Sequence, residues 1–188
     1  MKEISDTALI DRILGGDISG FSILVDRYKD LAFTLAFRIT GIREDAEEVV
    51  QDAFLNAYKG LDRFRQKAKF STWLYRIVYN KAVSRKRLKK VQVTSIDEAT
   101  VDNQPSEEFY DAEGETIHEE RTWLLNRAMD SLTGEDRTLV TLYYLNEQTV
   151  NEIHAVTGLS RANVKVRLFR ARKKLQDVLE KHSGLVLV

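Results

Sequence analysis

Basic and aromatic side chains are interleaved in the middle of the first half of the chain. Between Lys59 and Lys90 there are 12 lysines and arginines, a single acid, Asp62, and five aromatic rings. Cations follow the phosphates of a nucleic-acid strand, while rings stack on bases that are not paired. This stretch therefore predicts a surface for single-stranded DNA. The alternative is that Phe70, Trp73 and Tyr79 are core residues, and for Phe70 we favour that interpretation.

A helical wheel shows which side chains of this stretch share a face. The face that lies opposite Leu74 and Ile77 is the one expected to meet DNA. Asn80 lies on it, and its amide offers both a donor and an acceptor, so it could hold a base flipped out of the duplex. The face consists of Arg76, Asn80, Val83, Arg87 and Lys90, with Trp73 at its border.

A second basic stretch lies near the end of the chain. Seven bases and no acid fall between Arg161 and Lys174. They belong to the second of two predicted helices, at about 150–156 and 160–179, that a turn at Gly158 separates, which is the pattern of a helix-turn-helix. The outer face also offers small and apolar groups that can meet thymine methyls. The alternative is a solvated basic helix whose charges complement the helix dipole.

A polar row of the opposite character lies on the predicted helix at 45–59. Its members recur at helical spacing on the side away from the apolar stripe, and one of them is a leucine. A partner that covers this row would explain the leucine, although single exposed leucines are common. The row consists of Glu48, Gln51, Asp52, Leu55 and Lys59.

The remaining residues do not favour enzyme chemistry. The chain has no cysteine, and its three histidines, His118, His154 and His182, stand in no metal-ligand spacing such as HExxH. No glycine-rich phosphate loop is present, and neighbouring acids such as Glu47 and Glu48 imply no acid–base chemistry without a pocket. We therefore expect no catalytic residue, no metal ion and no cofactor, and surface or packing roles for the histidines.

The elements that position these surfaces are predicted to be helices, which makes the fold class all-α. One proline and nine glycines leave long uninterrupted stretches, in which apolar residues recur at helical spacing. The longest stripe stops before Gly41, a natural helix terminator. The predicted helices of the first half cover about 6–14, 21–39, 46–61 and 70–88.

Charge divides the chain into three parts. Residues 1–90 carry 18 bases and 12 acids, and we expect them to form one small helical domain. Residues 91–120 carry ten acids and no base, with few large apolar residues, which predicts an acidic flexible linker. The helical pattern resumes at Glu119, and residues 121–188, with 11 bases and seven acids, form the second small domain, which contains the helix-turn-helix. Two basic blocks joined by an acidic strip favour binding of a polyanion at two surfaces.

No part of the sequence predicts a membrane segment. Charged residues interrupt the first 17 residues, and no later stretch approaches the roughly 20 apolar residues that a membrane helix needs. We therefore expect no membrane insertion. The absence of cysteine fits a reducing, intracellular compartment without requiring one.

Three motifs, in this order, resemble the sigma factors of bacterial RNA polymerase, specifically the small extracytoplasmic-function (ECF) group. Residues 45–58, DAEEVVQDAFLNAY, resemble the segment that docks on the clamp helices of the largest core subunit. Residues 70–77, FSTWLYRI, resemble the motif leading into the helix that melts and reads the −10 element. Residues 132–145 and 150–175 resemble the domain that reads the −35 element. The similarity covers nearly the whole chain apart from the linker and the tail.

The resemblance implies a role for the members of each surface, as follows. Core polymerase would be bound by Glu48, Gln51, Asp52, Leu55 and Lys59. The −10 element would be contacted by Lys69, Trp73, Arg76, Asn80 and Arg87, with Asn80 capturing a flipped base and the loop 64–69 forming part of the pocket. The −35 element would be contacted by Ser160, Arg161, Asn163, Lys165, Arg167, Phe169, Arg170 and Lys173.

The resemblance also implies the function and the partners. The chain would be an alternative, non-enzymatic transcription initiation factor in the cytoplasm, which directs polymerase to promoters and aids their melting. Its partners would be promoter DNA, an anti-sigma factor, and core RNA polymerase, through the clamp helices of the largest subunit and the flap of the second-largest. The linker would thread near the active-site cleft. One departure is residues 147–154, EQTVNEIH, which replace a more usual glycine-containing turn.

Two other classes of protein share parts of this pattern. A free-standing helix-turn-helix repressor would bind duplex DNA alone, but the basic and aromatic stretch from Lys59 to Lys90 argues against it. A helical anti-sigma factor or adaptor would leave both basic faces unexplained.

Overall fold

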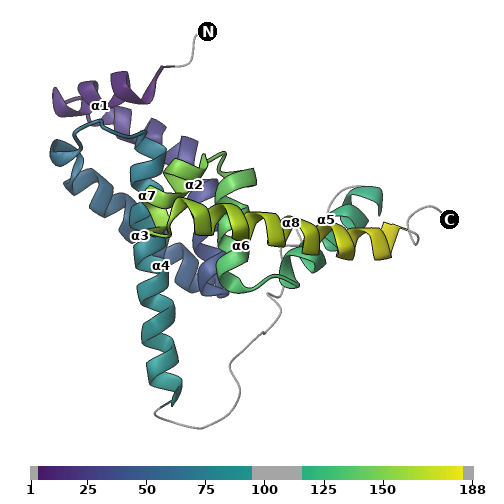
Figure 1. Cartoon of the computed structure of the whole chain (residues 1–188). Coiled ribbons are helices and arrows are strands. Elements are labelled where there is room, and N and C mark those ends of the chain that lie inside the picture. Colours follow the sequence, from purple (N-terminus) through teal and green to yellow (C-terminus); the bar gives the residue numbers. More distant parts are fainter. Residues whose placement is uncertain (1–3, 95–115, 184–188) are drawn as a thin grey trace.

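The computed structural model describes residues 4–94 and 116–183. These residues contain eight α-helices, two short helical turns and no strand (Figure 1). The all-helical class expected from the sequence is thereby confirmed. The side chains of residues 90–94, 116–121 and 182–183 are not described. Most of the expected linker, residues 91–120, falls outside the described ranges.

The first half is a packed set of four helices. Helix α2 lies against α1, α3 and α4, and α3 also lies against α4. Leu24, Leu35 and Leu74 are fully buried between them, as the apolar stripes predict. Phe70 is also buried, so its assignment to the core is confirmed. The elements are α1 (Asp6–Leu14), α2 (Ser19–Thr40), α3 (Arg43–Lys59), η1 (Leu61–Arg63) and α4 (Phe70–Thr94).

Helix α1 is tied to the first half at its beginning. The Ser5 hydroxyl accepts a hydrogen bond of 3.3 Å from the backbone N–H of Ala8 and so caps the helix. The Asp6 carboxylate, one residue further, accepts hydrogen bonds from Arg27 and Tyr28 of α2. The cap and the ion pair place the buried face of α1 on α2.

The second half contains the expected helix-turn-helix. Helix α7 begins with a capping box, in which Thr149 and Glu152 satisfy each other's backbone N–H groups. It ends at Gly158, which has a φ of 77°. This left-handed conformation is unfavourable for residues other than glycine, and it turns the chain toward α8. The elements are α5 (Thr116–Asp130), α6 (Gly134–Val140), η2 (Thr141–Leu145), α7 (Val150–Thr157) and α8 (Arg161–Ser183).

The boundaries of the helices differ slightly from the predicted ones. Helix α4 runs to Thr94, whereas the first domain was predicted to end at residue 90, where the run of lysines and arginines stops. Helix α5 begins at Thr116 rather than at Glu119. Charge marks a change in composition, whereas a helix continues for as long as its backbone hydrogen bonds do. Helix α4 projects beyond the rest of the molecule as a single helix (Figure 1).

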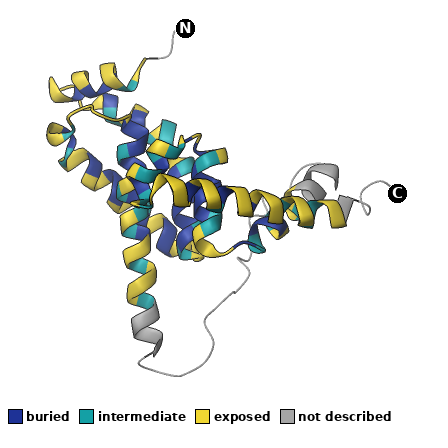
Figure 2. Ribbon diagram, viewed as in Figure 1, coloured by how far each residue is buried: buried dark blue, intermediate teal, exposed yellow. Residues whose placement is uncertain are grey.

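The two halves pack directly on each other. Helix α7 lies across α4, and α6 and η2 lie against α2. One cluster of buried apolar residues therefore runs through both halves, and Figure 2 shows it where these helices meet. The distal part of α4 and the outer side of α8 are exposed (Figure 2). Within the described ranges, no helix is both long and apolar enough to cross a membrane.

Candidate nucleic-acid and protein interfaces

The face of α4 expected to meet DNA begins with a pair of stacked rings. Trp73 is half-buried and stacks on Phe64, with 4.8 Å between the ring centroids. Phe64 belongs to the loop 64–69, where Gln66 adopts a positive φ of 52°. The rings line a cavity of about 280 Å³ together with Arg63, Arg65 and Arg76. Rings and cations in one recess suit a base that has left the duplex.

Further along α4, Arg76, Asn80 and Arg87 are all exposed, and Lys69 is exposed just before the helix begins. These positions follow one side of α4. Tyr79 is half-buried and packs against the core, so the core alternative describes it better than a contact with DNA. The structure thus brings the five residues expected at the −10 element to one helix and the loop before it.

The polar row of α3 is exposed along its whole length. Leu55, the leucine of this row, is 56% exposed. It lines an apolar groove of about 770 Å³ between α2 and α3, together with Gln51 and the exposed Ile18. The rest of the groove is formed by Phe21, Val25, Lys29, Val50, Phe54 and Tyr58. An apolar groove beside this polar row is typical of a surface that binds another protein.

Three acids of α3 pair with bases of α4, an arrangement that the sequence analysis missed. Lys81 contacts Asp52 at 2.8 Å, and Arg85 contacts both Asp45 and Glu48. Lys89 contacts Asp45 at 2.6 Å. The signal in the sequence is the spacing of the bases, at every fourth residue of α4, beside acids at helical spacing on α3.

These ion pairs between α3 and α4 form a ladder, and Asp45 is its buried end, with a side chain that is 5% exposed. Burial disfavours its charged form, but hydrogen bonds from Lys89 and Arg85 outweigh burial and hold the pKa of Asp45 below its ordinary value. Asp45 is therefore a structural anchor between α3 and α4. Glu48 and Asp52 remain exposed at its outer edge.

Helix α8 packs through one side and exposes the other. Val164, Leu168 and Ala171 are buried, as the sequence predicts. Ser160 caps the helix by accepting a 3.2 Å hydrogen bond from the N–H of Asn163. Phe169 is 67% exposed, which is unusual for a large ring. The other exposed members of the predicted set are Ser160, Arg161, Asn163, Lys165, Arg170 and Lys173.

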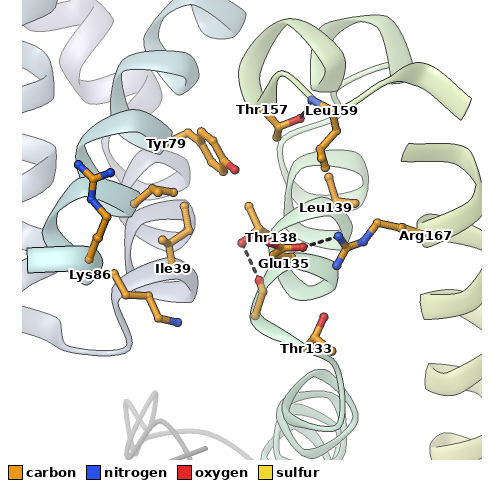
Figure 3. Close-up of a pocket in the computed structure, with 13 residues that line it drawn as sticks. Ile39, Tyr79, Lys86, Thr133, Glu135, Thr138, Leu139, Thr157, Leu159 and Arg167 are labelled. Carbon is orange, nitrogen blue, oxygen red and sulfur yellow. Dashed lines mark hydrogen bonds and ion pairs between the residues drawn. The ribbon is translucent and has the colours of Figure 1, made fainter. Parts of the chain in front are cut away.

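Arg167 is placed differently from the rest of that set. Its guanidinium pairs with Asp136 at 2.6 Å and with Glu135, both at the start of α6. Burial disfavours its charge, but these two acids raise the pKa of Arg167 above its ordinary value. In this structure Arg167 holds α8 to α6. Its side chain is directed toward the first half, where it borders a cavity between the halves (Figure 3).

The histidines show no metal site in the part of the chain whose side chains are described. The Nδ1 atom of His154 lies 2.7 Å from the backbone oxygen of Leu159, so this histidine packs the end of α7. His118 and His182 lie outside those side chains. No group of His, Asp and Glu among the described residues could hold a metal ion.

Comparisons with known proteins identify both halves. Residues 24–91 match the family model described as Sigma-70 region 2, and residues 122–175 match that described as Sigma-70, region 4. The ECF RNA polymerase sigma factor SigW of Bacillus subtilis is 31% identical over 176 residues, which cover 90% of this chain and 94% of that protein. The ECF RNA polymerase sigma-E factor of Escherichia coli K12 is also 31% identical, over 95% of this chain and 96% of that protein.

Two solved structures share the fold. CnrH, in a complex with the cytosolic domain of CnrY, superposes with a TM-score of 0.65 at 24% identity and covers 95% of this chain and 99% of CnrH. RpoE of Bartonella quintana, in a complex with the anti-sigma factor NepR, gives a TM-score of 0.70 at 20% identity, with coverage of 85% and 96%. The arrangement of helices found here is therefore that of these two proteins.

Proposed function

The chain belongs to the ECF sigma factors of RNA polymerase, which direct the enzyme to promoters, and from this premise we propose which of its surfaces performs each task. The observation that carries the proposal is the distribution of the exposed faces. Helices α4 and α8 each present bases, whereas α3 presents acids beside an apolar groove. Two faces thus suit DNA and one suits a protein.

The α3 face binds core polymerase. Glu48, Gln51 and Asp52 supply polar contacts, Leu55 enters the interface from the rim of the groove, and Lys59 closes the row. Burial of apolar area gives such an interface its affinity, and the charges set its orientation. The clamp helices of the largest core subunit are the proposed partner of this face, and the flap of the second-largest subunit that of the second half.

The α4 face reads and melts the −10 element. Lys69, Arg76 and Arg87 follow the phosphates, while Trp73 stacks on a base beside the cavity of the loop 64–69. Asn80 supplies the donor and acceptor that recognise the edge of a flipped base. The chain performs no chemistry itself, because the polymerase forms every covalent bond.

The exposed face of α8 reads the −35 element as duplex. The N-terminal end of the helix, with Ser160, Arg161 and Asn163, enters the major groove, as in other helix-turn-helix proteins. Lys165, Arg170 and Lys173 contact phosphates or base edges, and Phe169 meets thymine methyls. Arg167, because it is already paired with α6, supports the position of the helix.

The proposal extends to the setting in which the chain works. It acts where the polymerase acts, in the cytoplasm, and an anti-sigma factor controls it by holding the two halves together. The cavity between the halves supports the second point, because it leaves room for a segment of another protein.

Core binding tests the assignment of α3 directly. Asp52→Lys reverses a charge on the proposed face, and we expect it to weaken binding to core polymerase by about tenfold, which corresponds to about 1.4 kcal/mol. Asp30→Lys makes the same change on an exposed residue of α2 that does not line the groove, and it serves as the matched control. Equal affinities of the two variants, measured by competition with labelled wild-type chain, would contradict the assignment.

A further inference from the structure

The loop 64–69 lies between two cavities. On one side is the cavity of about 280 Å³ at Trp73, which is assigned to a flipped base. On the other side is a cavity of about 240 Å³ that α1 and α2 help to line. Phe64 and Ala68 border both cavities. Because the loop is not backed by a close-packed core, packing alone does not fix its conformation.

Neighbouring residues of this loop face opposite cavities. Arg65 and Lys67 line the cavity at Trp73, whereas Gln66, between them, lines the cavity at α1. Gln66 adopts a positive φ of 52°, which is uncommon for residues other than glycine. Such a conformation persists only where the surrounding structure holds it in place. The turn at Gln66 therefore decides how two cations are presented to the cavity that receives the base.

Helix α1 holds Gln66 in this position. The Gln66 side-chain nitrogen donates a hydrogen bond of 3.3 Å to Asp11 Oδ1, across 55 residues of sequence. Helix α1 also lies against η1, just before the loop, and runs beside the segment that joins α3 to α4 (Figure 1). The position of α1 is itself fixed, because the Asp6 carboxylate accepts hydrogen bonds from Arg27 and Tyr28 of α2. The hydrogen bond thus joins a strained loop to an anchored helix.

Asp11 has the wrong charge for a contact with DNA. It is exposed on α1, away from the buried side of that helix, and it contacts the loop that carries Arg65 and Lys67. A carboxylate beside a surface that binds phosphates is repelled by them. A contact within the chain, with Gln66, therefore accounts for Asp11 better than a contact with DNA does.

We propose that α1 holds the loop 64–69 in the conformation that selects the −10 base, through the hydrogen bond between Asp11 and Gln66. Both are positioning residues, which act on the base through Arg65, Lys67 and the shape of the cavity. Without the bond the loop populates several conformations, and the cavity then discriminates less between bases. The proposal rests on the assignment of the α4 face to the −10 element.

Base selection from a random pool tests this proposal. The probe is a pool of duplex DNA fragments interrupted by a single-stranded stretch of random sequence, and it is offered to the complex of the full chain with core polymerase. Sequencing of the bound DNA gives the enrichment of each base at each position, and core polymerase alone gives the background. Trp73→Ala identifies the position that the cavity reads, because enrichment there should be lost.

Removal of the hydrogen bond should lower selection at that position alone. Asp11→Ala removes the acceptor, and Gln66→Gly removes the donor without straining the turn, because glycine adopts a positive φ readily. We expect either variant to reduce the enrichment of the preferred base by about fivefold, the equivalent of one ordinary hydrogen bond. Asp11→Asn keeps an oxygen that can accept the bond and should stay within about twofold of the wild type. Asp30→Ala removes an exposed carboxylate of α2 and is the matched control.

A double variant distinguishes positioning from direct contact. If Gln66 acts through Asp11, then Asp11→Ala causes no further loss in the Gln66→Gly chain. Gln66→Gly should also keep the thermal midpoint of the wild type, so that loss of folded chain does not explain its loss of selection. Additive losses in the double variant, or undiminished selection by Asp11→Ala, would overturn the inference alone. A wild-type complex that enriches no base would instead contradict the proposed function.

Discussion

Thr72 of α4 and Gln148 of the turn before α7 lie 76 residues apart in the sequence and share a buried hydrogen bond of 2.9 Å between the two halves. Neither residue is among the side chains that the sequence assigns to contacts with DNA or with core polymerase. Both are nevertheless among the few buried polar side chains of the described residues. Because a buried polar group without a partner is costly, this pair fixes how the halves meet.

Replacing Gln148 should therefore lower the stability of the folded chain. We expect Gln148→Ala to lower the free energy of unfolding by about 1–3 kcal/mol, because the Thr72 hydroxyl is left buried without an acceptor. Urea denaturation followed by circular dichroism measures this value. Gln176→Ala, which removes a surface amide of α8, should change it by less than about 0.5 kcal/mol. Equal effects of the two substitutions would show that the contact contributes nothing.

The ion pairs of Asp45 predict a dependence on pH. Because its folded pKa lies below the unfolded value of about 3.9, Asp45 contributes stability that is fully present above that value. The contribution is lost as the pH falls through the folded pKa. Asp45→Asn should thus lower the free energy of unfolding by about 1–3 kcal/mol at pH 7. The difference between the free energies of unfolding of this variant and the wild type should become smaller below about pH 4.

Urea denaturation at pH 7, 5 and 3 provides the comparison for Asp45. Asp26→Asn alters an exposed pair with Lys29 and should cost less than about 1 kcal/mol at every pH. A difference between wild type and Asp45→Asn that stays constant down to pH 3 would contradict the role assigned to the ladder.

Gly158 sets the angle between α7 and α8 through its backbone alone. Its φ is positive, and a Cβ there would meet no atom within 4 Å. Gly158→Ala should therefore destabilise the chain by about 1–2 kcal/mol through strain, without any steric clash. Gly134→Ala, at a helical glycine with ordinary φ, should be neutral or slightly stabilising. Thermal unfolding distinguishes the two, and a neutral Gly158→Ala would mean that another conformation of the turn is equally stable.

Two neighbouring bases of α8 should respond differently to substitution. Lys165→Ala should weaken binding to duplex DNA and reduce the salt dependence of log K by about 1, with no loss of stability. Arg167→Ala should lower the free energy of unfolding by about 1 kcal/mol, because Asp136 loses its partner. Binding titrations between about 50 and 200 mM salt, together with urea denaturation, separate the two roles. Identical profiles for both variants would contradict the placement of Arg167.

Local patterns in the sequence predicted the helices and their exposed faces well. The apolar stripes placed Leu24, Leu35 and Leu74 in the core, because helical spacing directly reports which side of a helix is buried. The turn at Gly158 likewise marked the end of α7. The row on α3 and the basic face of α8 were identified for the same reason.

The contacts between elements could not be predicted in the same way. Arg167 shares the spacing and charge of Lys165, and only the position of α6 shows that it is paired with Asp136. The bond from Thr72 to Gln148 depends on how two helical halves dock, which no periodicity encodes. The ladder of Asp45, Arg85 and Lys89 was predictable only in part. The spacing of its charges is visible in the sequence, but the sequence does not show that α3 lies beside this side of α4.

We propose that this chain takes core RNA polymerase to promoters through the α3, α4 and α8 faces. The most direct measurement mixes the purified chain with bacterial core polymerase at physiological salt and follows transcription from genomic DNA fragments. We expect a stoichiometric complex and defined transcript start sites, each preceded by the same two spaced sequence elements. Failure to bind core polymerase, or transcription that begins at the same places without the chain, would contradict it.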